Sequence, residues 1–238
     1  MKIILSRKGF DTVNGGCPSP IMPDGTLLSL PIPSDDALTY SDIAYNGLTY
    51  HQLLRYLNPK KEYQGCHLDP DILSDTRLVS HPNWEPAFGQ IDAAQGMLHN
   101  CGIGENDLFL FFGMFRHVEK TSANGYRYFK GETPIHLIFG YLQIGQVLTK
   151  PEEVEKYSWH PHADLSRRYE KNNALYLPRK ALDFDVSKPG CGIFKFSKNR
   201  ILTMPNKSMA TWHKIPALMP DNIISKRKNS AADGGFDN

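Results

Sequence analysis

Residues 107–148 of this chain read DLFLFFGMFRHVEKTSANGYRYFKGETPIHLIFGYLQIGQVL, and this stretch decides the fold class. Its dense Phe and Leu content predicts β-strands over residues 107–117, 126–129 and 135–148. Asn124-Gly125 is a strong hairpin-turn signal before the second of these strands. Gly140 and Gly145 interrupt the third strand, where we expect bulges or close backbone contacts.

Helices precede this strand-rich middle. Thr49 and Gln52 have the spacing of a capping box, and the apolar stripe that follows predicts a helix over residues 49–58. A second helix is expected over residues 85–101, with Gly102 as its C-terminal cap. Shorter elements are expected as well: an acidic helix over 151–157 and strands over 2–5, 174–177, 192–196 and 201–204.

This order of loop, helices and strands indicates an α+β fold. We expect one domain over residues 1–225, with a mostly antiparallel, partly barrel-like sheet, a few flanking helices and a long ordered N-terminal loop. Residues 226–238, KRKNSAADGGFDN, predict a flexible basic tail.

Composition narrows the class of protein. The chain has 238 residues, of which 40% are hydrophobic and 22% charged, as in an ordinary soluble domain. The longest apolar run, around residues 108–115, is too short to span a membrane, so we expect no membrane contact. The four cysteines are isolated and form no CxxC pair, which favours free thiols and a cytoplasmic location. The net charge of +2 neither demands nor excludes a nucleic-acid partner.

The first 33 residues predict a long, folded loop with a cationic, glycine-rich start. Its glycines and basic side chains suit an anion or nucleotide site, although neither GxxxxGK[ST] nor GxGxxG is present. A solvated basic turn is the alternative. The candidate anion-binding residues are Ser6, Arg7, Lys8, Gly9, Gly15 and Gly16. Cys17 in the same loop is a conceivable nucleophile if the nearby cations lower its pKa.

Two short histidine motifs are candidates for catalysis. In CHLDPD, alternation in an extended segment places His67, Asp69 and Asp71 on one side, where they could hold a divalent cation or act as an acid/base pair. An ordinary turn is the alternative, and Arg77 could pair with either carboxylate. In HPH, His160 and His162 fit a surface or lid loop that touches substrate better than a zinc site, because Pro161 argues against a central strand.

Several aromatic residues could stack on a base, although core packing is the simpler explanation for most of them. Trp84 and Trp159 stand apart because polar residues and prolines flank them. Tyr141, together with Phe112, would complete an aromatic pocket.

Seven motifs together resemble the nucleotide modification associated domain 3 family: LSRKGFD, GGCPSPIMPDG, LPIP, HLDPD, WEPAFGQIDAAQG, NDLFLFFGMFR and HLIFGYLQIG. The resemblance covers residues 2–212 and implies a link to base modification in bacteria and their phages, without a reaction or a residue role. More weakly, residues 104–107 and the apolar strand after them are similar to PUA-like barrels, which bind RNA or modified bases. Asn106 departs from the glycine usual before Asp in those barrels.

These observations support three hypotheses. The first is an enzyme acting on a nucleotide or on a base in DNA, in which the N-terminal loop grips phosphate and the histidine motifs, with Asp11, supply acid/base or metal chemistry. The second is a non-catalytic reader that captures a flipped or modified base in an aromatic pocket. The third is an accessory subunit that binds the partner proteins of a modification system. DNA is the favoured partner, and no cofactor or metal is assigned. The enzyme hypothesis predicts that residues 6–11, 67–71 and 160–162 converge in one pocket.

Overall fold

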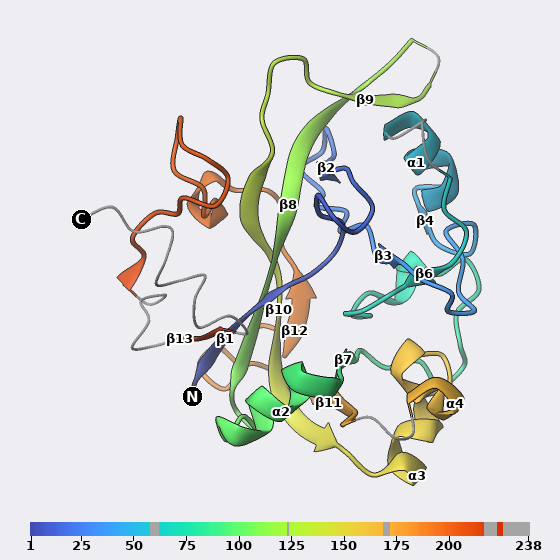
Figure 1. The fold of residues 1–238 in the computed structure, drawn as a ribbon, viewed down its shortest axis with the longest axis vertical. Helices are drawn as coiled ribbons and strands as arrows, with labels where there is room; N and C mark the ends of the chain where they lie inside the picture. The colour runs from blue at the N-terminus through green and yellow to red at the C-terminus, as the bar shows by residue number, and fades with distance from the viewer. Residues whose placement is uncertain (58–61, 123, 169–171, 217–222, 226–238) are drawn as a thin grey trace.

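The computed structural model describes residues 1–57, 62–122, 124–168, 172–216 and 223–225 (Figure 1). The described strands form a nine-stranded mixed sheet with the central order β13-β1-β8-β10-β11-β7, while β2 and β9 pair with β8 and β12 pairs with β10. These strands are β1 (Ile3–Arg7), β2 (Ser19–Ile21), β7 (Phe88–Gln90), β8 (Leu108–Lys120), β9 (Tyr126–Tyr128), β10 (Ile135–Leu148), β11 (Ala174–Pro178), β12 (Cys191–Ile193) and β13 (Ile223–Ser225).

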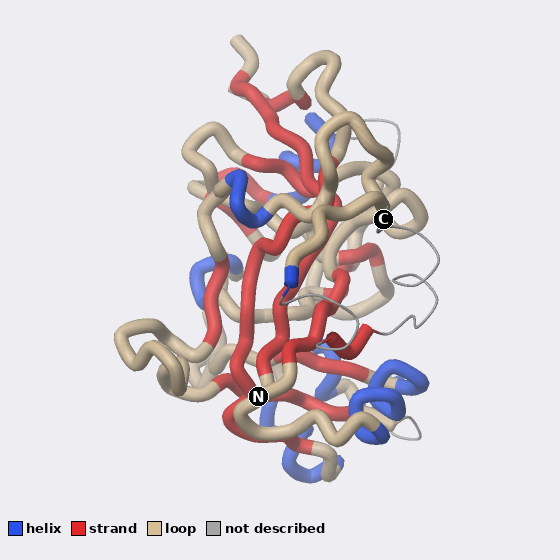
Figure 2. The backbone as a smooth tube through the Cα atoms, turned by 90° about the vertical axis from the view of Figure 1, so that its left-hand side faces the viewer, coloured by secondary structure: helices blue, strands red, loops and turns tan. Residues whose placement is uncertain are grey.

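Small elements surround this sheet. Two further pairs of strands, β3 (Ile32–Pro33) with β6 (Cys66–His67) and β4 (Ala44–Tyr45) with β5 (Leu48–Thr49), form separate two-stranded sheets. The helices are α1 (Tyr50–Leu57), α2 (Asp92–Asn100), α3 (Pro151–Val154) and α4 (Leu165–Arg168), and the 3₁₀ turns are η1 (Ser74–Thr76), η2 (Glu155–Tyr157), η3 (Pro161–Ala163) and η4 (Lys198–Arg200). Figure 2 shows these short helices and many loops around the long strands. None of the described helices is long and apolar enough to span a membrane.

The α+β class and the single domain are confirmed, but the sheet is open. β1 runs parallel to both β8 and β13, and β2 runs parallel to β8, while the other pairs of the large sheet are antiparallel. One edge of β10 is shared: residues 140–142 pair with β12, and residues 144–148 pair with β11. This branching leads the strands away from each other. The sheet therefore does not close, and the expected partly barrel-like shape does not form.

The long strands form where the sequence predicts them. The register of β10 shifts between Ile138 and Gly140 and again between Ile144 and Gln146, as the interrupting glycines predict. β8 is buried on both faces because alternate residues enter different clusters: Phe109 and Phe111 belong to the main core, whereas Leu110 and Phe112 face the cluster around Leu202.

The helix expected over 49–58 is present as α1, with the capping box formed by Thr49 and Gln52. The helix expected over 85–101 is only partly correct. Residues 92–100 are helical, but Phe88–Gln90 form strand β7 and pair with β11. The apolar side chain of Phe88 is fully buried in the main core of the sheet, so tertiary packing overrides the helical spacing. Residues 201–204 make only isolated bridges, and the predicted tail at 226–238 lies outside the described residues.

The N-terminal loop is folded, as predicted. Phe10 and Leu30 are fully buried and pack in one cluster with Leu53 of α1 and Cys66 of β6. A third cluster of apolar side chains contains Ala87, Ala163 and Leu175, and holds α3 and η3 beside β11. In Figure 1, α1, β3 and β6 lie to one side of the long strands, and α4 and α3 lie lower down on the same side.

Candidate functional site

Lys8 reaches the interior directly after β1. Its backbone amide donates to the carbonyl oxygen of Phe112 at 2.9 Å. A Cβ atom on Gly113 would lie 2.7 Å from the Lys8 carbonyl oxygen, so glycine is needed there for the two chains to approach. The Lys8 ammonium lies 2.7 Å from Oδ2 of Asp69 and 4.3 Å from the ring centre of Phe88. One cation of the N-terminal loop therefore does meet the HLDPD motif.

Asp69 is deeply enclosed, with 1% of its side chain exposed. Its Oδ1 accepts a hydrogen bond of 2.7 Å from the backbone amide of Gly89 and lies 3.5 Å from Nε2 of His160. Burial alone would raise the pKa of Asp69, but the Lys8 ammonium and His160 outweigh burial and hold that pKa well below its ordinary value. The carboxyl group is therefore ionised in the folded protein.

His67 and His162 lie beside Asp69. One ring nitrogen of each histidine and a carboxylate oxygen of Asp69 all lie within 4.8 Å of one another. The imidazole rings of His67 and His162 have centroids 5.2 Å apart, and the ring of His160 lies 5.5 Å from that of His162. We call Lys8, His67, Asp69, His160 and His162 the histidine–aspartate cluster.

Neighbouring groups fix the orientation of both histidines. Nδ1 of His67 lies 2.6 Å from Oδ2 of Asp36, and Nδ1 of His162 lies 2.8 Å from Oδ1 of Asn173. Each oxygen can only accept, so Nδ1 carries the proton in both rings. Burial lowers the pKa of His162 to about 3, although Asp69 opposes that shift, and its imidazole is neutral near pH 7.

Asp36 is shared between His67 and two arginines. Its Oδ1 accepts hydrogen bonds of 2.9 Å from both Arg167 and Arg168 at the end of α4. Burial alone would raise the pKa of Asp36, but the hydrogen bonds from His67 and Arg168 lower it overall. This network ties α4 to the two-stranded β3–β6 sheet that carries His67.

Three packed regions supply the cluster. Lys8 follows a strand of the main sheet, His67 belongs to the two-stranded β3–β6 sheet packed against the N-terminal loop, and His162 belongs to η3 beside the third apolar cluster. Gly89 lets η3 approach the sheet, because a Cβ atom there would lie 2.2 Å from the ring of His162. The site therefore lies where these regions meet.

Asp71 lies beside the cluster and serves as an anchor. Its Oδ2 accepts a hydrogen bond of 2.7 Å from Arg77, as sequence proximity suggests. The same guanidinium donates to the Trp159 carbonyl oxygen at 2.9 Å. Asp71 thus acts through Arg77 on the segment that precedes His160. It is not one of the residues with the spacing of metal ligands, which are His67, Asp69 and His162.

The rest of the predicted anion site lies apart. Arg7 pairs with Asp11 at 2.8 Å, and Asp11 accepts hydrogen bonds from the backbone amides of Val13 and Asn14. Ser6 is buried within β1. Gly9, Gly15 and Gly16 have positive φ angles that suit tight turns. The amides of Phe10, Asp11 and Gly16 donate to backbone carbonyls, so they do not form an open anion cradle.

The predicted aromatic residues are found in separate places. Trp159 stacks near His81, with ring centroids 4.8 Å apart, whereas Tyr141 stacks on Phe194 at 5.1 Å. Phe112 packs edge-on against Trp212. Among the described residues, no ring contact joins Trp84, Phe112, Tyr141 and Trp159 directly, and a shared base-binding pocket formed by them stays a prediction. Burial raises the pKa of Cys17 to about 11, which opposes the role of an activated nucleophile.

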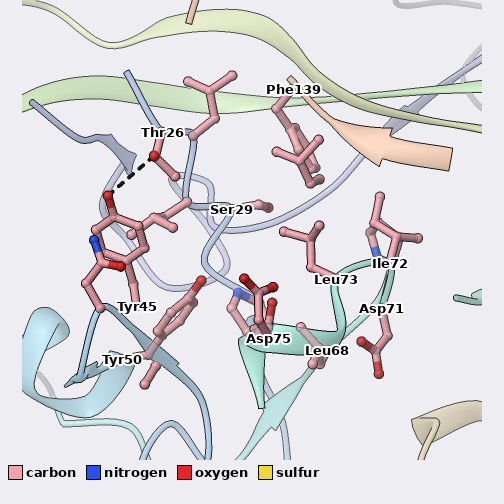
Figure 3. Close-up of a pocket in the computed structure, with 18 of the residues that line it drawn as sticks. Thr26, Ser29, Tyr45, Tyr50, Leu68, Asp71, Ile72, Leu73, Asp75 and Phe139 are labelled. Carbon is pink, nitrogen blue, oxygen red and sulfur yellow. Dashed lines mark hydrogen bonds between the residues drawn. The ribbon is translucent and has the colours of Figure 1, made fainter. Parts of the chain in front are cut away.

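A pocket of about 340 Å³ lies beside the cluster. Figure 3 shows its lining: Tyr45 and Tyr50 on one side, Leu68 to Leu73 on another, with Asp75 and Ser29 directed into the space between them. The hydroxyl group of Tyr45 donates to Thr26 at 3.3 Å. Asp69 is also among the lining residues, whereas none of the three histidines of the cluster is. The pocket and the cluster therefore share the HLDPD segment as a common wall.

Sequence reasoning missed Asp36, Gly89, Arg167, Arg168 and Asn173. The hydrogen bond between Asp36 and Arg168 spans 132 positions, and no local spacing signals a contact of that kind. For Gly89, the helical spacing around it concealed its place in a strand.

Comparison with known proteins gives one match. The sequence matches the model of the family described as nucleotide modification associated domain 3 over residues 2–234. No curated protein and no solved structure matches the chain.

Proposed function

Because the chain belongs to the nucleotide modification associated domain 3 family, we propose that it is an enzyme that modifies a nucleotide or a base in DNA, with the histidine–aspartate cluster as its reactive centre. One observation carries this proposal: Lys8, the pair His67 and Asp69, and the pair His160 and His162 come from three distant stretches of sequence and converge at one position. Such convergence of ionisable groups is typical of catalytic sites.

The energetic cost of this arrangement supports a function beyond stability. Side chains of Asp69 and His160 are 1% and 0% exposed, so both lose nearly all contact with water. Desolvating the Asp69 carboxylate costs several kcal/mol, and its attraction to the Lys8 ammonium only partly repays that cost. Apolar side chains of similar volume would stabilise this position at least as well.

The adjoining pocket provides room for the substrate. A volume of about 340 Å³ lies within the range of small-molecule sites and suits a nucleobase or nucleoside. Tyr45 and Tyr50 offer aromatic surface, and Ser29 and Asp75 offer hydrogen-bonding groups for a base edge. We place the base there, with the reacting atom directed towards Asp69.

A non-catalytic reader is less well supported. A reader needs an aromatic cage, and the aromatic side chains expected to form one lie in separate contacts. It does not need a buried lysine, carboxylate and histidines at one position.

Nucleoside analysis tests the proposal. The wild-type chain, Asp69→Asn and the control Asp185→Asn would each be expressed in a bacterium, and the DNA and the free nucleotide pool would be digested and analysed by mass spectrometry. Asp185 is fully exposed, and its carboxylate accepts hydrogen bonds from the amide and hydroxyl groups of Ser187 in the same turn. We expect a modified nucleoside with the wild type and the control, reduced roughly 100-fold or more with Asp69→Asn.

Two results would overturn the proposal that the chain is an enzyme. One is an identical nucleoside composition of DNA and of the free nucleotide pool with and without the chain. The other is full modification by a folded Asp69→Asn protein. Binding of the chain to modified oligonucleotides over a salt series, without any change in them, would support the reader instead.

A further inference from the structure

His67, Asp69 and His162 make up a set of two imidazoles and one carboxylate whose donor atoms lie within 4.8 Å of one another. Among the histidine, cysteine and acidic side chains of the described residues, these three have the spacing of metal ligands. Two histidines and one carboxylate occupying one face of an ion is a recurrent arrangement for divalent transition metals.

Both imidazoles are prepared as ligands. Since Nδ1 of His67 and Nδ1 of His162 are held by Asp36 and Asn173, Nε2 is the nitrogen that each ring can offer. Metal-binding histidines in proteins nearly always donate their other N–H to a carboxylate or amide oxygen in this way. Both His67 and His162 have such a partner.

Asp69 has capacity for one more bond. Its two oxygens have about four lone-pair positions. Lys8 and the Gly89 amide occupy one each, and His160 lies at a longer 3.5 Å. A carboxylate that is already fixed by these neighbours can bind an ion without losing rotational freedom.

We propose that His67, Asp69 and His162 bind one divalent first-row transition metal ion. The imidazoles favour iron(II), cobalt(II), manganese(II) or zinc over magnesium or calcium, which prefer all-oxygen sites. This metal site deepens the proposed function, because the ion would lie in the proposed reactive centre. It rests on that function only in that both involve the histidine–aspartate cluster. Three protein ligands leave positions open for water or substrate, which is typical of reactive rather than structural metal sites.

The surroundings fit an ion that activates a substrate. Bonds of about 2.1 Å place neighbouring ligands about 3 to 3.4 Å apart, so the donors must move together by about 1 Å when the ion binds. Lys8 and the half-exposed Arg167 remain nearby as cations for an anionic ligand group such as a phosphate.

Metal titration of the purified full chain tests this inference. Protein freed of metal by chelator dialysis would be titrated with cobalt(II) while its visible absorption is recorded, and with iron(II), manganese(II) and zinc by calorimetry, iron(II) under anaerobic conditions. We expect one ion per chain. His67→Ala and Asp69→Asn should weaken binding by about 100-fold or more, and Asp36→Asn by about 10- to 100-fold.

His117→Ala is the matched control. Nδ1 of His117 also lies 2.7 Å from a carboxylate oxygen, that of Glu132, but His117 is not part of the three-residue group. This variant should bind the ion like the wild type. Circular dichroism and thermal unfolding of every variant would separate lost ligands from lost fold.

The results distinguish this inference from the proposed function. Absence of binding to the folded wild type, or equal binding by folded His67→Ala and Asp69→Asn, would overturn the metal site. Modified nucleosides formed by a folded wild-type protein that binds none of these ions would overturn it as well and leave the enzyme standing. One bound ion per chain without any modified nucleoside would contradict the enzyme and leave the metal site standing.

Discussion

At the scale of single residues, Gly89 is a position in the candidate site with no room for a side chain. Its amide donates to Asp69, and its missing Cβ makes room for the ring of His162. Gly89→Ala would place a carbon 2.2 Å from that ring, so either η3 or β7 must shift. We expect the free energy of unfolding to fall by about 1 to 3 kcal/mol, measured by denaturant titration, together with weaker metal binding.

Gly104→Ala provides the control, because no neighbouring atom lies within 4 Å of its added Cβ. It should change the free energy of unfolding by less than about 0.5 kcal/mol. Equal stability and metal affinity of Gly89→Ala and wild type would show that His162 does not depend on this close approach.

His136 gives a pH dependence that is separate from the candidate site. Burial lowers its pKa to about 4, Arg7 adds to that shift and Asp11 opposes it, while its ordinary value is 6.5. The unfolded chain therefore binds more protons than the folded chain between these values. Titration of His136 therefore leaves the free energy of unfolding unchanged above pH 6.5. As the pH falls from 6.5 towards 4, it lowers that free energy by up to about 3 kcal/mol.

Chemical unfolding at pH 7, 5.5 and 4.5 would measure this loss. His136→Gln, which keeps an acceptor for Trp212, should lose less stability than the wild type over that range. If the free energies of unfolding of the two proteins decreased in parallel with falling pH, His136 would not titrate as described.

At the scale of elements, the sequence correctly predicts features that depend on the spacing of neighbouring residues. The stripe Tyr50, Leu53, Leu54 and Leu57 gives α1, and the glycines of β10 mark its register shifts. Local pattern fails at Phe88, where apolar spacing fits a helix but burial against Phe109 and Tyr176 selects a strand. For the site, alternation predicts His67 near Asp69, as found, whereas Asp71 pairs with Arg77 and is not part of that group.

The contact between η1 and the chain before η3 depends on Arg77. Removing its guanidinium leaves the carboxylate of Asp71 buried without its cation and frees the Trp159 carbonyl oxygen. Arg77→Met should lower the free energy of unfolding by about 3 to 5 kcal/mol. Amide hydrogen exchange should accelerate most around residues 159–163.

The double variant Arg77→Met with Asp71→Asn removes both charges and is the control. It should recover part of the lost stability, because no unpaired buried charge remains. Unchanged exchange around residues 159–163 in Arg77→Met would show that this ion pair does not hold the segment in place.

At the scale of the whole molecule, the candidate site joins three packed regions, and this arrangement has a thermodynamic consequence. Lys8, His67 and His162 each depend on a different set of buried side chains, so no single segment carries the site. This is also why sequence reasoning could identify the three motifs but not show that Lys8 rather than Arg7 meets Asp69. An ion held between the regions binds the folded chain and not the unfolded one. Its binding therefore stabilises the complete fold.

The size of this effect follows from mass action. A ligand at 100 times its dissociation constant adds about 2.7 kcal/mol to the free energy of unfolding, which raises the melting temperature of a chain this long by about 5 to 10 °C. We expect such a rise for the wild type and His117→Ala with the tightest-binding metal, and little or none for Asp69→Asn. Calorimetric scans with and without metal would measure it. If instead the metal raised the melting temperature of Asp69→Asn equally, the ion would bind elsewhere, and the meeting point of the three regions would be a structural junction rather than a metal centre.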